Sequence, residues 1–396
     1  MFPGAIAAEA PNRPAVIMAS TGQEITFKEL DEAANRLSQV LRTAGLNPGD
    51  HVAFCIENHP RYFEILWGCH YAGLIYTACS SRLTTDELNY IINDCGAKAF
   101  ITSKHKADQA AEVASTTPNV SLRLMLDGKI DGYDSYEDTV SKAPATELAN
   151  RVDGVDMLYS SGTTGRPKGI KLGLAMTPLG TPTSLSGLCS MLFAIDKDAI
   201  YLSPAPLYHA APLRFTMTTH RLGGTAIIME HFDAEEYLKL IAKHKVTHSQ
   251  LVPTMFVRML KLDEKVRRQF DTSSLKCAIH AAAPCPVEVK KKMIDWWGPV
   301  IHEYYAGSEG NGFVYCNSEQ WLAHPGTVGV ALNATVHICG EDGEELPLNE
   351  SGTVYFESNV NFEYHNDPEK TKSSRDPLGR GWTTLGDVGY LDKDNF

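Results

Sequence analysis

Apolar and polar positions in the first hundred residues alternate between helical spacing and short apolar runs. Thr26 and Glu29 form the pattern of a capping box, and the apolar residues that follow recur at intervals of three and four as far as Gly45. This pattern predicts a helix over 26–45, and the apolar run 52–56 predicts a buried strand. The further elements predicted here are a helix over 60–72, a strand over 74–78, a helix over 84–96 capped by Thr84 and Glu87, and a strand over 99–102. Strands that alternate with helices indicate parallel sheets covered on both faces.

The same alternation returns in the second part of the chain. A capping pattern at Asp233 and Glu236 predicts the start of a helix. The other elements predicted are strands over 155–159, 225–229, 246–251, 275–279 and 300–304, and a helix over 287–297. Two α/β subdomains, approximately 1–150 and 151–310, are therefore expected.

Beyond about residue 311 the pattern changes to short strands and turns. Strands are predicted over 335–338, 353–356 and 388–391. These elements indicate a small β-rich subdomain over 311–396. Gly, Pro, Ser and Thr are frequent over 173–187, which is typical of a surface loop or lid.

Residues 159–169, with the sequence YSSGTTGRPKG, carry the most informative chemistry of the chain. Small residues allow backbone N–H groups to turn inward, hydroxyl side chains add donors, and Lys168 supplies a positive charge, a combination suited to a polyphosphate. Gly169 follows the lysine where a Walker A loop needs Ser or Thr, so the stretch is not a Walker A loop. A cluster of Gly, Ser and Thr is ordinarily a flexible linker, but the Pro-Lys-Gly ending argues against a linker here.

Charge, cysteine content and hydropathy exclude several classes of protein. A net charge of −12 argues against a nucleic-acid partner. The sequence has neither an apolar run of 18 residues nor the features of a signal peptide, so no transmembrane helix is predicted. Nine cysteines without a Cys-x-x-Cys pair indicate free thiols and a cytoplasmic location. Since His and Cys show no zinc-site spacing, the metal expected with a polyphosphate is Mg²⁺.

The stretch 159–169 closely resembles the phosphate loop of the adenylate-forming superfamily, which includes acyl-CoA synthetases, peptide-synthetase adenylation domains and beetle luciferases. Five further segments resemble motifs of this family, in the same order along the chain. They are 204–209 (PAPLYH), 281–284 (AAAP), 305–309 (YAGSE), 326–329 (GTVG) and 381–387 (GWTTLGD). The resemblance covers nearly the whole chain. It implies an α/β fold with two doubly wound αβα subdomains and a small β-barrel-like subdomain.

The resemblance also implies a role for each segment at an ATP site. The loop hydroxyls and amides would hold the β- and γ-phosphates, and the alanines would form a platform for adenine. Tyr305 would stack on adenine, Ser308 would bind the α-phosphate, and Asp387 would accept hydrogen bonds from both ribose hydroxyls. The nucleotide-binding residues implied are Ser160, Ser161, Gly162, Thr163, Thr164, Gly165, Lys168, Ala281, Ala282, Ala283, Tyr305, Ser308 and Asp387.

The catalytic residues implied are His209, which would orient the acid, Lys168, and Glu309, which would coordinate Mg²⁺. Ordinary structural interpretations stand beside these roles. Lys168 is also explained by a solvated surface position, Tyr305 by core packing, Asp387 by a turn and His209 by a satisfied polar position. The chain departs from the family pattern in having Ala306 for glycine, and Ser308 and Leu385 for threonine.

The activity implied is that of an acid–CoA ligase. Such an enzyme joins a carboxylic acid to AMP with release of pyrophosphate, and then transfers the acyl group to coenzyme A. Small and apolar residues in 248–255 and 280–284, with no obvious carboxylate partner for an ammonium group, predict a hydrophobic acid instead of an amino acid. Bacterial fatty-acid and steroid-type CoA ligases are the most similar subgroup.

Three alternatives stay open. The chain is also compatible with an adenylation domain that loads a carrier protein, with a luciferase-like oxygenase, and with a nucleotide-binding module that does not turn over. A homodimer is likewise left open.

The last residues predict a strand, a turn over 392–395, and a returning strand that Phe396 begins. In the adenylate-forming superfamily, which the chain resembles, this point lies just before a hinge and a mobile C-terminal domain that carries a catalytic lysine. We therefore expect that domain to be absent. We also expect residues 1–396 to bind AMP, to form the adenylate slowly, and to make no measurable acyl-CoA.

Overall fold

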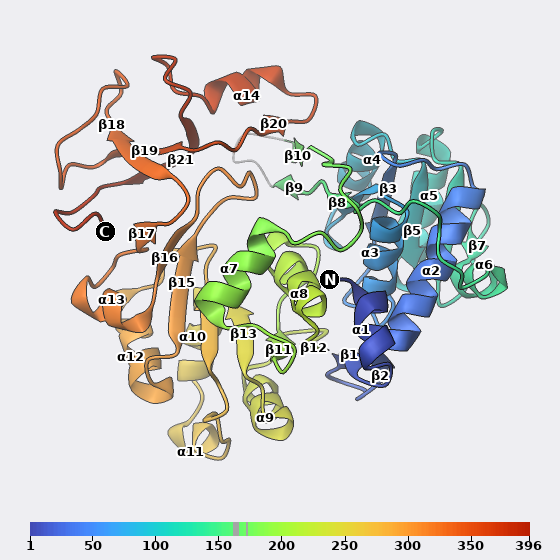
Figure 1. The fold of residues 1–396 in the computed structure, drawn as a ribbon, viewed down its shortest axis with the longest axis horizontal. Helices are drawn as coiled ribbons and strands as arrows, with labels where there is room; N and C mark the ends of the chain where they lie inside the picture. Colours follow the sequence, from blue (N-terminus) through green and yellow to red (C-terminus); the bar gives the residue numbers. More distant parts are fainter. Residues whose placement is uncertain (161–165, 172) are drawn as a thin grey trace. The chain divides into compact units, whose positions relative to one another are not determined.

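The computed structural model describes residues 1–160, 166–171 and 173–396. The chain forms two compact units, Met1–His231 and Phe232–Phe396, coloured from blue to green and from yellow-green to red in Figure 1. Each is a mixed α/β unit with parallel strands, as the alternating pattern predicts. The approximate subdomain bounds expected from the sequence stay predictions.

The first sheet of the unit Met1–His231 is entirely parallel, in the order β7-β6-β5-β3-β4-β8. The chain passes from β3 to β4 on one side and then to β5 on the other, which is the pattern of a doubly wound sheet. The strands are β3 (His51–Cys55), β4 (Ile75–Ala78), β5 (Ala99–Ser103), β6 (Leu122–Leu126), β7 (Asp134–Ser135) and β8 (Val155–Asp156).

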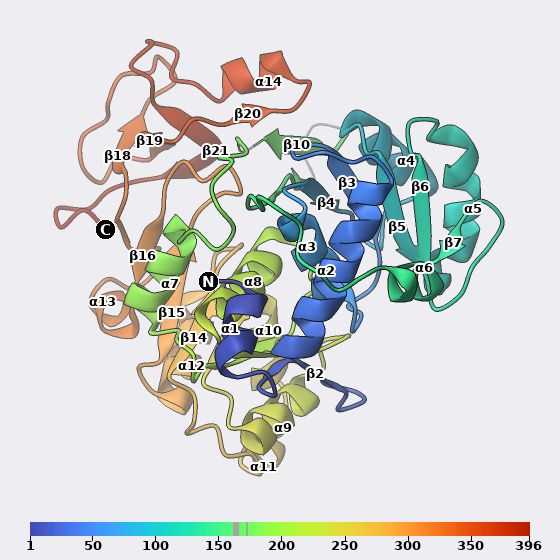
Figure 2. The same ribbon diagram turned by 45° about the vertical axis from the view of Figure 1, so that its right-hand side comes forward.

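Helices cover both faces of this sheet (Figure 2). Val52 and Phe54 of β3 pack with α2 (Phe27–Thr43) and α3 (Tyr62–Tyr71). Ala53 and Cys55 point to the other face and pack with α4 (Thr85–Asp94) and α5 (Ala107–Thr116). Successive residues of a strand face opposite sides, so a strand buried on both faces reads as the continuous apolar run seen at 52–56.

The predicted helix starts are confirmed in detail. Thr26 and Glu29 form a complete capping box at α2, and Thr84 and Glu87 form another at α4. Gly45 and Gly96 follow the ends of these helices with φ of +87° and +65°, a conformation that glycine adopts without strain.

The same unit contains a second set of strands in the order β11-β12-β1-β2. β11 and β12, and β12 and β1, pair in parallel, whereas β2 is antiparallel to β1. These strands are β1 (Pro14–Met18), β2 (Glu24–Thr26), β11 (Ile200–Ser203) and β12 (Thr225–Ile228). The associated helices are α1 (Pro3–Glu9), α6 (Tyr136–Lys142), α7 (Ser184–Phe193) and α8 (Ala210–Leu222).

Two sequence predictions in this unit were wrong in part. Residues 155–159 form two strands instead of one, because β8 pairs with β4 whereas β9 (Tyr159–Ser160) turns away to pair with β10 (Lys168–Lys171). The loop predicted over 173–187 ends earlier, because Thr183 accepts a hydrogen bond from the Ser186 N–H and thereby caps α7.

The unit Phe232–Phe396 contains the parallel strands β13 (His248–Leu251), β14 (Cys277–His280) and β15 (Ile301–Tyr305). β16 (Val314–Cys316) and β17 (Val330–Ala331) continue this sheet in antiparallel fashion. Its helices are α9 (Ala234–His244), α10 (Pro253–Leu260), α11 (Glu264–Arg267), α12 (Val287–Trp297) and α13 (Ser318–Ala323). Asp233 caps α9 as predicted.

A second sheet in this unit has the order β18-β19-β21 and is antiparallel. It consists of β18 (Thr335–Cys339), β19 (Gly352–Glu357) and β21 (Thr383–Gly389), and β20 (Glu363–Tyr364) and α14 (Pro368–Ser373) lie between β19 and β21 in the chain. The strand predicted over 388–391 was misplaced, because β21 pairs with β19 from Thr383 onward. Phe396 belongs to no assigned strand, and its carbonyl accepts from the Asp392 N–H across the turn.

All nine cysteines are free thiols, and eight of them are buried. Cys285, between β14 and α12, is partly exposed, and burial raises its pKa to about 11. None of the helices in the described parts of the chain is both long and apolar enough to cross a lipid bilayer.

Candidate active site

The predicted phosphate loop connects the two strands of a hairpin. β9 and β10 are antiparallel, and Ser160 lies opposite Lys168. The Lys168 side chain is half-buried at this position. Ser161, Gly162, Thr163, Thr164 and Gly165, which are also predicted to bind phosphates, lie outside the described residues.

The base of this hairpin is attached to α4. The Tyr159 hydroxyl donates a hydrogen bond to Asp94 Oδ2 over 2.5 Å, and the Arg166 guanidinium lies 5.1 Å from the ring centroid of Tyr90. Burial, followed by the bond to Asp94, raises the pKa of Tyr159, so this phenol stays neutral and donates. The hairpin strands that carry Ser160 and Lys168 are therefore attached to α4, one of the helices that cover the first sheet.

His209 is the N-cap residue of α8, at the end of the segment 204–209. The residue is exposed, and its ring centroid lies 4.4 Å from that of Tyr208. Desolvation by the surrounding protein lowers the pKa of His209, and the nearby charge of Arg82 lowers it further. The imidazole is consequently neutral at pH 7 and can accept a hydrogen bond.

The three alanines predicted as an adenine platform follow the carboxyl end of β14. Ala281 is buried, whereas Ala282 and Ala283 are exposed. Ala282 has φ of +72°, a left-handed conformation that costs a residue with a Cβ on the order of 1–3 kcal/mol. Such strain is typical of functional segments, where the backbone itself contacts a ligand.

Tyr305, the last residue of β15, lies beside Asp387 of β21. The Tyr305 hydroxyl donates to Asp387 Oδ2 over 2.8 Å. Burial raises the pKa of Tyr305, and the adjacent Asp387 carboxylate raises it further, so the phenol is a donor. A carboxylate can accept several hydrogen bonds, and Asp387 is exposed, so this bond leaves it capacity for further donors.

Glu309 is buried, with 8% of its surface exposed, and its Oε1 accepts a hydrogen bond from the Tyr364 hydroxyl of β20 over 2.8 Å. A Cβ at Gly307 would lie 2.6 Å from Glu309 Oε2 and 2.8 Å from Leu385, so a larger residue there would displace these two side chains. Ser308, between Gly307 and Glu309, is half-buried. The segment 305–309 is thus packed closely against the strands that carry Tyr364 and Asp387.

Comparison with known protein families matches residues 5–363 to the AMP-binding enzymes. The chain belongs to this family. A feruloyl-CoA synthase from Amycolatopsis is 31% identical over 382 residues, which cover 95% of this chain and 73% of that protein. The long-chain-fatty-acid–CoA ligase FadD13 of Mycobacterium tuberculosis is 28% identical over 392 residues, covering 98% of this chain and 75% of that protein.

Solved structures agree with this assignment of the AMP-binding enzyme. The inhibitor-bound N-terminal domain of FACL13 from Mycobacterium tuberculosis superposes with a TM-score of 0.85 at 26% identity, covering 99% of this chain and 96% of that one. ATP-bound MatB from Rhodopseudomonas palustris superposes with a TM-score of 0.80 at 26% identity, covering all of this chain and 78% of that one.

In this AMP-binding enzyme, two ion pairs attach α8 to the residues that precede the phosphate hairpin. Arg214 Nη2 lies 2.8 Å from Asp156 Oδ2, and Arg221 Nη2 lies 2.8 Å from Asp153 Oδ2. The two arginines are seven residues apart, which is about two helical turns, so they project from one face of α8. The helix that begins after His209 is therefore fixed against the chain leading to Ser160.

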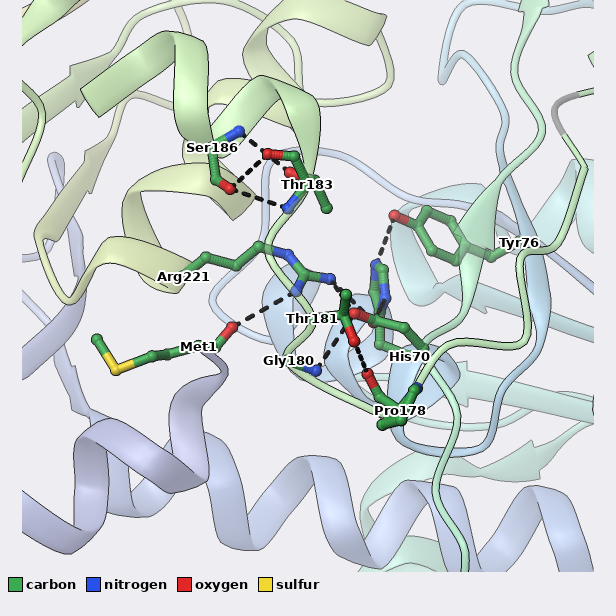
Figure 3. Close-up of polar contacts among 10 residues, drawn as sticks. Met1, His70, Tyr76, Pro178, Gly180, Thr181, Thr183, Ser186 and Arg221 are labelled. Atoms are coloured by element: carbon green, nitrogen blue, oxygen red, sulfur yellow. Dashed lines mark hydrogen bonds and ion pairs between the residues drawn. The ribbon is translucent and has the colours of Figure 1, made fainter. Parts of the chain in front are cut away.

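The ion pair between Arg221 and Asp153 is part of a buried polar network (Figure 3). Asp153 Oδ1 accepts from His70 Nδ1 over 2.6 Å, and Tyr76 lies 3.1 Å from His70 Nε2. The Gly180 N–H also donates to Asp153. The sequence did not predict this network or the ion pair between Arg214 and Asp156, because the partners are up to 83 residues apart and follow no recurrent spacing.

Proposed function

We propose that this AMP-binding enzyme activates a hydrophobic carboxylic acid with ATP, and that the full-length protein then transfers the acyl group to coenzyme A. The observation that carries the proposal is the arrangement of the segment 305–309 with Asp387 and Tyr364. It brings a phenol, a buried carboxylate and an exposed carboxylate to the carboxyl end of β15. Membership of the AMP-binding family and the names of its relatives, which are CoA ligases and synthases, support the same reaction.

In the unit Phe232–Phe396, the proposed role of Asp387 is to accept hydrogen bonds from the ribose hydroxyls of AMP. Tyr305 orients that carboxylate through its 2.8 Å hydrogen bond and offers its ring to adenine. Ser308 donates to the α-phosphate. The proposed role of Ala281, Ala282 and Ala283 is to present small side chains, and the strained backbone at Ala282, to the planar base.

Glu309 fits the requirements of Mg²⁺ with ATP. Mg²⁺ usually takes one or two carboxylates together with phosphate oxygens and water. Glu309 provides one carboxylate, and Tyr364 restrains it by donating to Oε1. When bound, the ion would neutralise part of the charge on the phosphates.

In the unit Met1–His231, we assign the β- and γ-phosphates to the hairpin, with Lys168 as a positive charge beside Ser160. His209 is assigned to the substrate acid. Its imidazole is neutral, so it orients the attacking carboxylate without forming an ion pair with it. Both roles are positioning and charge neutralisation, which dominate reactions at phosphorus.

The reaction then proceeds in two balanced steps. A carboxylate oxygen of the acid attacks the α-phosphorus of ATP, the bond to the bridging oxygen breaks, and pyrophosphate leaves. The sulfur of coenzyme A next attacks the acyl carbon, AMP leaves, and the thiol proton passes to solvent.

The first experiment is ATP–pyrophosphate exchange with aryl, long-chain fatty, steroid and amino acids compared at equal concentration. We expect exchange with one of the hydrophobic classes and none with amino acids. With the full-length protein, addition of coenzyme A should yield the thioester, detected by mass spectrometry. Binding of ATP without exchange for any acid would favour a nucleotide-binding module, and preference for an amino acid would overturn the proposal.

A pair of lysines on one strand provides a matched comparison. Lys168→Ala should slow exchange by about 100- to 1,000-fold, because a charge aimed at the phosphates is lost. Lys171→Ala, three residues along β10 and exposed, should leave exchange unchanged. Equal effects of the two substitutions would contradict the role of Lys168.

A further inference from the structure

The side chain of Asn58 makes three hydrogen bonds to backbone groups far away in the sequence. Its Nδ2 donates to the carbonyl of Ala205 over 3.1 Å and to that of Met229 over 2.8 Å. Its Oδ1 accepts from the Leu207 N–H over 2.9 Å. Asn58 follows the carboxyl end of β3, whereas its partners follow the carboxyl ends of β11 and β12. One amide therefore joins the first sheet to both neighbouring strand ends of the second set.

The segment 204–209 depends on such a contact because it has few donors of its own. Pro204 and Pro206 have no N–H, so the Leu207 N–H is the first donor after the second proline. Asn58 accepts from that N–H and donates to Ala205, and in this way it holds the segment on both sides of Pro206.

The position of His209 follows from this attachment. The His209 N–H donates to the carbonyl of Pro206 over 3.2 Å, and the His209 carbonyl accepts from Leu213 in the first turn of α8. Leu207, between them, is completely buried. A shift of the residues that Asn58 holds would therefore be transmitted through one short turn to His209.

Asparagine suits this position better than any similar side chain. The side chain is 8% exposed, and both of its donors and its acceptor are engaged. Aspartate would lack the donors and would face two carbonyl oxygens with a negative charge, and leucine of similar size would leave all three backbone groups unpaired.

We propose that Asn58 is a positioning residue for His209 and thereby sets the geometry of the adenylation step. This inference rests on the proposed function, in which His209 orients the acid. Asn58 touches no reacting atom; it acts through the backbone of the segment 204–209.

The test is a double-mutant cycle on ATP–pyrophosphate exchange with the best acid substrate. Asn58→Leu should lower kcat by about 10- to 100-fold, the range expected when a catalytic group is misplaced by about 1 Å. The KM for ATP should change less than about twofold, because no ATP-binding group is removed. In a His209→Ala background, Asn58→Leu should have little further effect, since both changes remove the same contribution.

Thr102→Val is the matched control. Thr102 is buried beside β3, and its hydroxyl donates to the Cys55 carbonyl over 2.9 Å, so the substitution removes a buried hydrogen bond near the same strand end without touching the segment 204–209. We expect an unchanged kcat. If Asn58→Leu and His209→Ala multiply in the double variant, or if Thr102→Val lowers kcat as much, the positioning role is refuted. Asn58→Asp supports the same cycle if the leucine variant does not fold.

A structural measurement separates this inference from the proposed function. A crystal structure of the Asn58 variant should contain a displaced segment 204–209 with β11 unchanged. An unmoved segment would overturn the positioning role whatever the activity. Absence of acid-dependent exchange in the unmodified enzyme would instead overturn the proposed function and leave the structural result to stand alone.

Discussion

Replacement of Asp387 by alanine tests the nucleotide assignment most directly. In the proposed complex the carboxylate accepts two hydrogen bonds from the ribose, in addition to the 2.8 Å bond from Tyr305. A hydrogen bond to a charged group contributes about 1.5–3 kcal/mol. Because Asp387 is exposed and hydrated when free, the lower value applies to each bond. The expected loss is about 3 kcal/mol, or roughly 150-fold in the Kd for AMP.

Isothermal titration with AMP measures this loss, and Tyr305→Phe is the companion variant. The phenylalanine keeps the ring and leaves the Asp387 carboxylate in place, so both proposed bonds to the ribose are kept and only the orienting bond is lost. Its Kd should rise less than about tenfold. AMP affinity that is unchanged in Asp387→Ala would refute the ribose assignment and identify Asp387 as a structural partner of Tyr305. A loss as large in Tyr305→Phe would show that the ring, and not the carboxylate, dominates binding.

Three further predictions concern charge. Arg82→Gln removes a cation that lowers the pKa of His209, so the acid limb of the exchange rate against pH should move to higher pH; a move to lower pH would contradict this reasoning. Asp153→Asn breaks a buried ion pair and should lower the free energy of unfolding, measured in urea, by about 3–5 kcal/mol. Glu32→Gln, which breaks an exposed ion pair, should lower it by less than about 1 kcal/mol. Burial raises the pKa of Asp153, but the contacts with His70, and then those with Arg221, lower it by more, so the stabilisation from these contacts is lost as pH falls below about 4. Glu309→Gln should raise the Mg²⁺ concentration needed for half-maximal exchange, and an unchanged requirement would exclude Glu309 as the ligand.

Local signals in the sequence predicted the helices and strands well. The capping boxes at Thr26 and Thr84 involve residues three positions apart, so their chemistry is visible in the sequence and is confirmed in the structure. Errors arose where pairing decides the outcome. The apolar run 155–159 is divided between two sheets, because its first residues pair with β4 and Tyr159 pairs with β10. β21 starts at Thr383 because it pairs with β19 from there.

The candidate site divides in the same way. Family-like motifs drew attention to Lys168, His209, Glu309 and Asp387, whose roles stay predictions. Asn58 could not be found from the sequence, because its partners lie 147 to 171 residues away and are backbone groups, which leave no mark on residue type. Side chains that act on a distant main chain are visible only once the strand ends have been brought together.

The buried cysteine thiols can report local opening of the protein structure. Five of the eight buried cysteines belong to the unit Met1–His231 and three to the unit Phe232–Phe396. A buried thiol reacts with an alkylating reagent only when its surroundings open transiently, so each labelling rate measures a local opening equilibrium. Mass spectrometry of partly alkylated protein would therefore measure the local opening of each unit separately, without an introduced probe. Cys285, which is partly exposed, would serve as the reference thiol that reacts without opening.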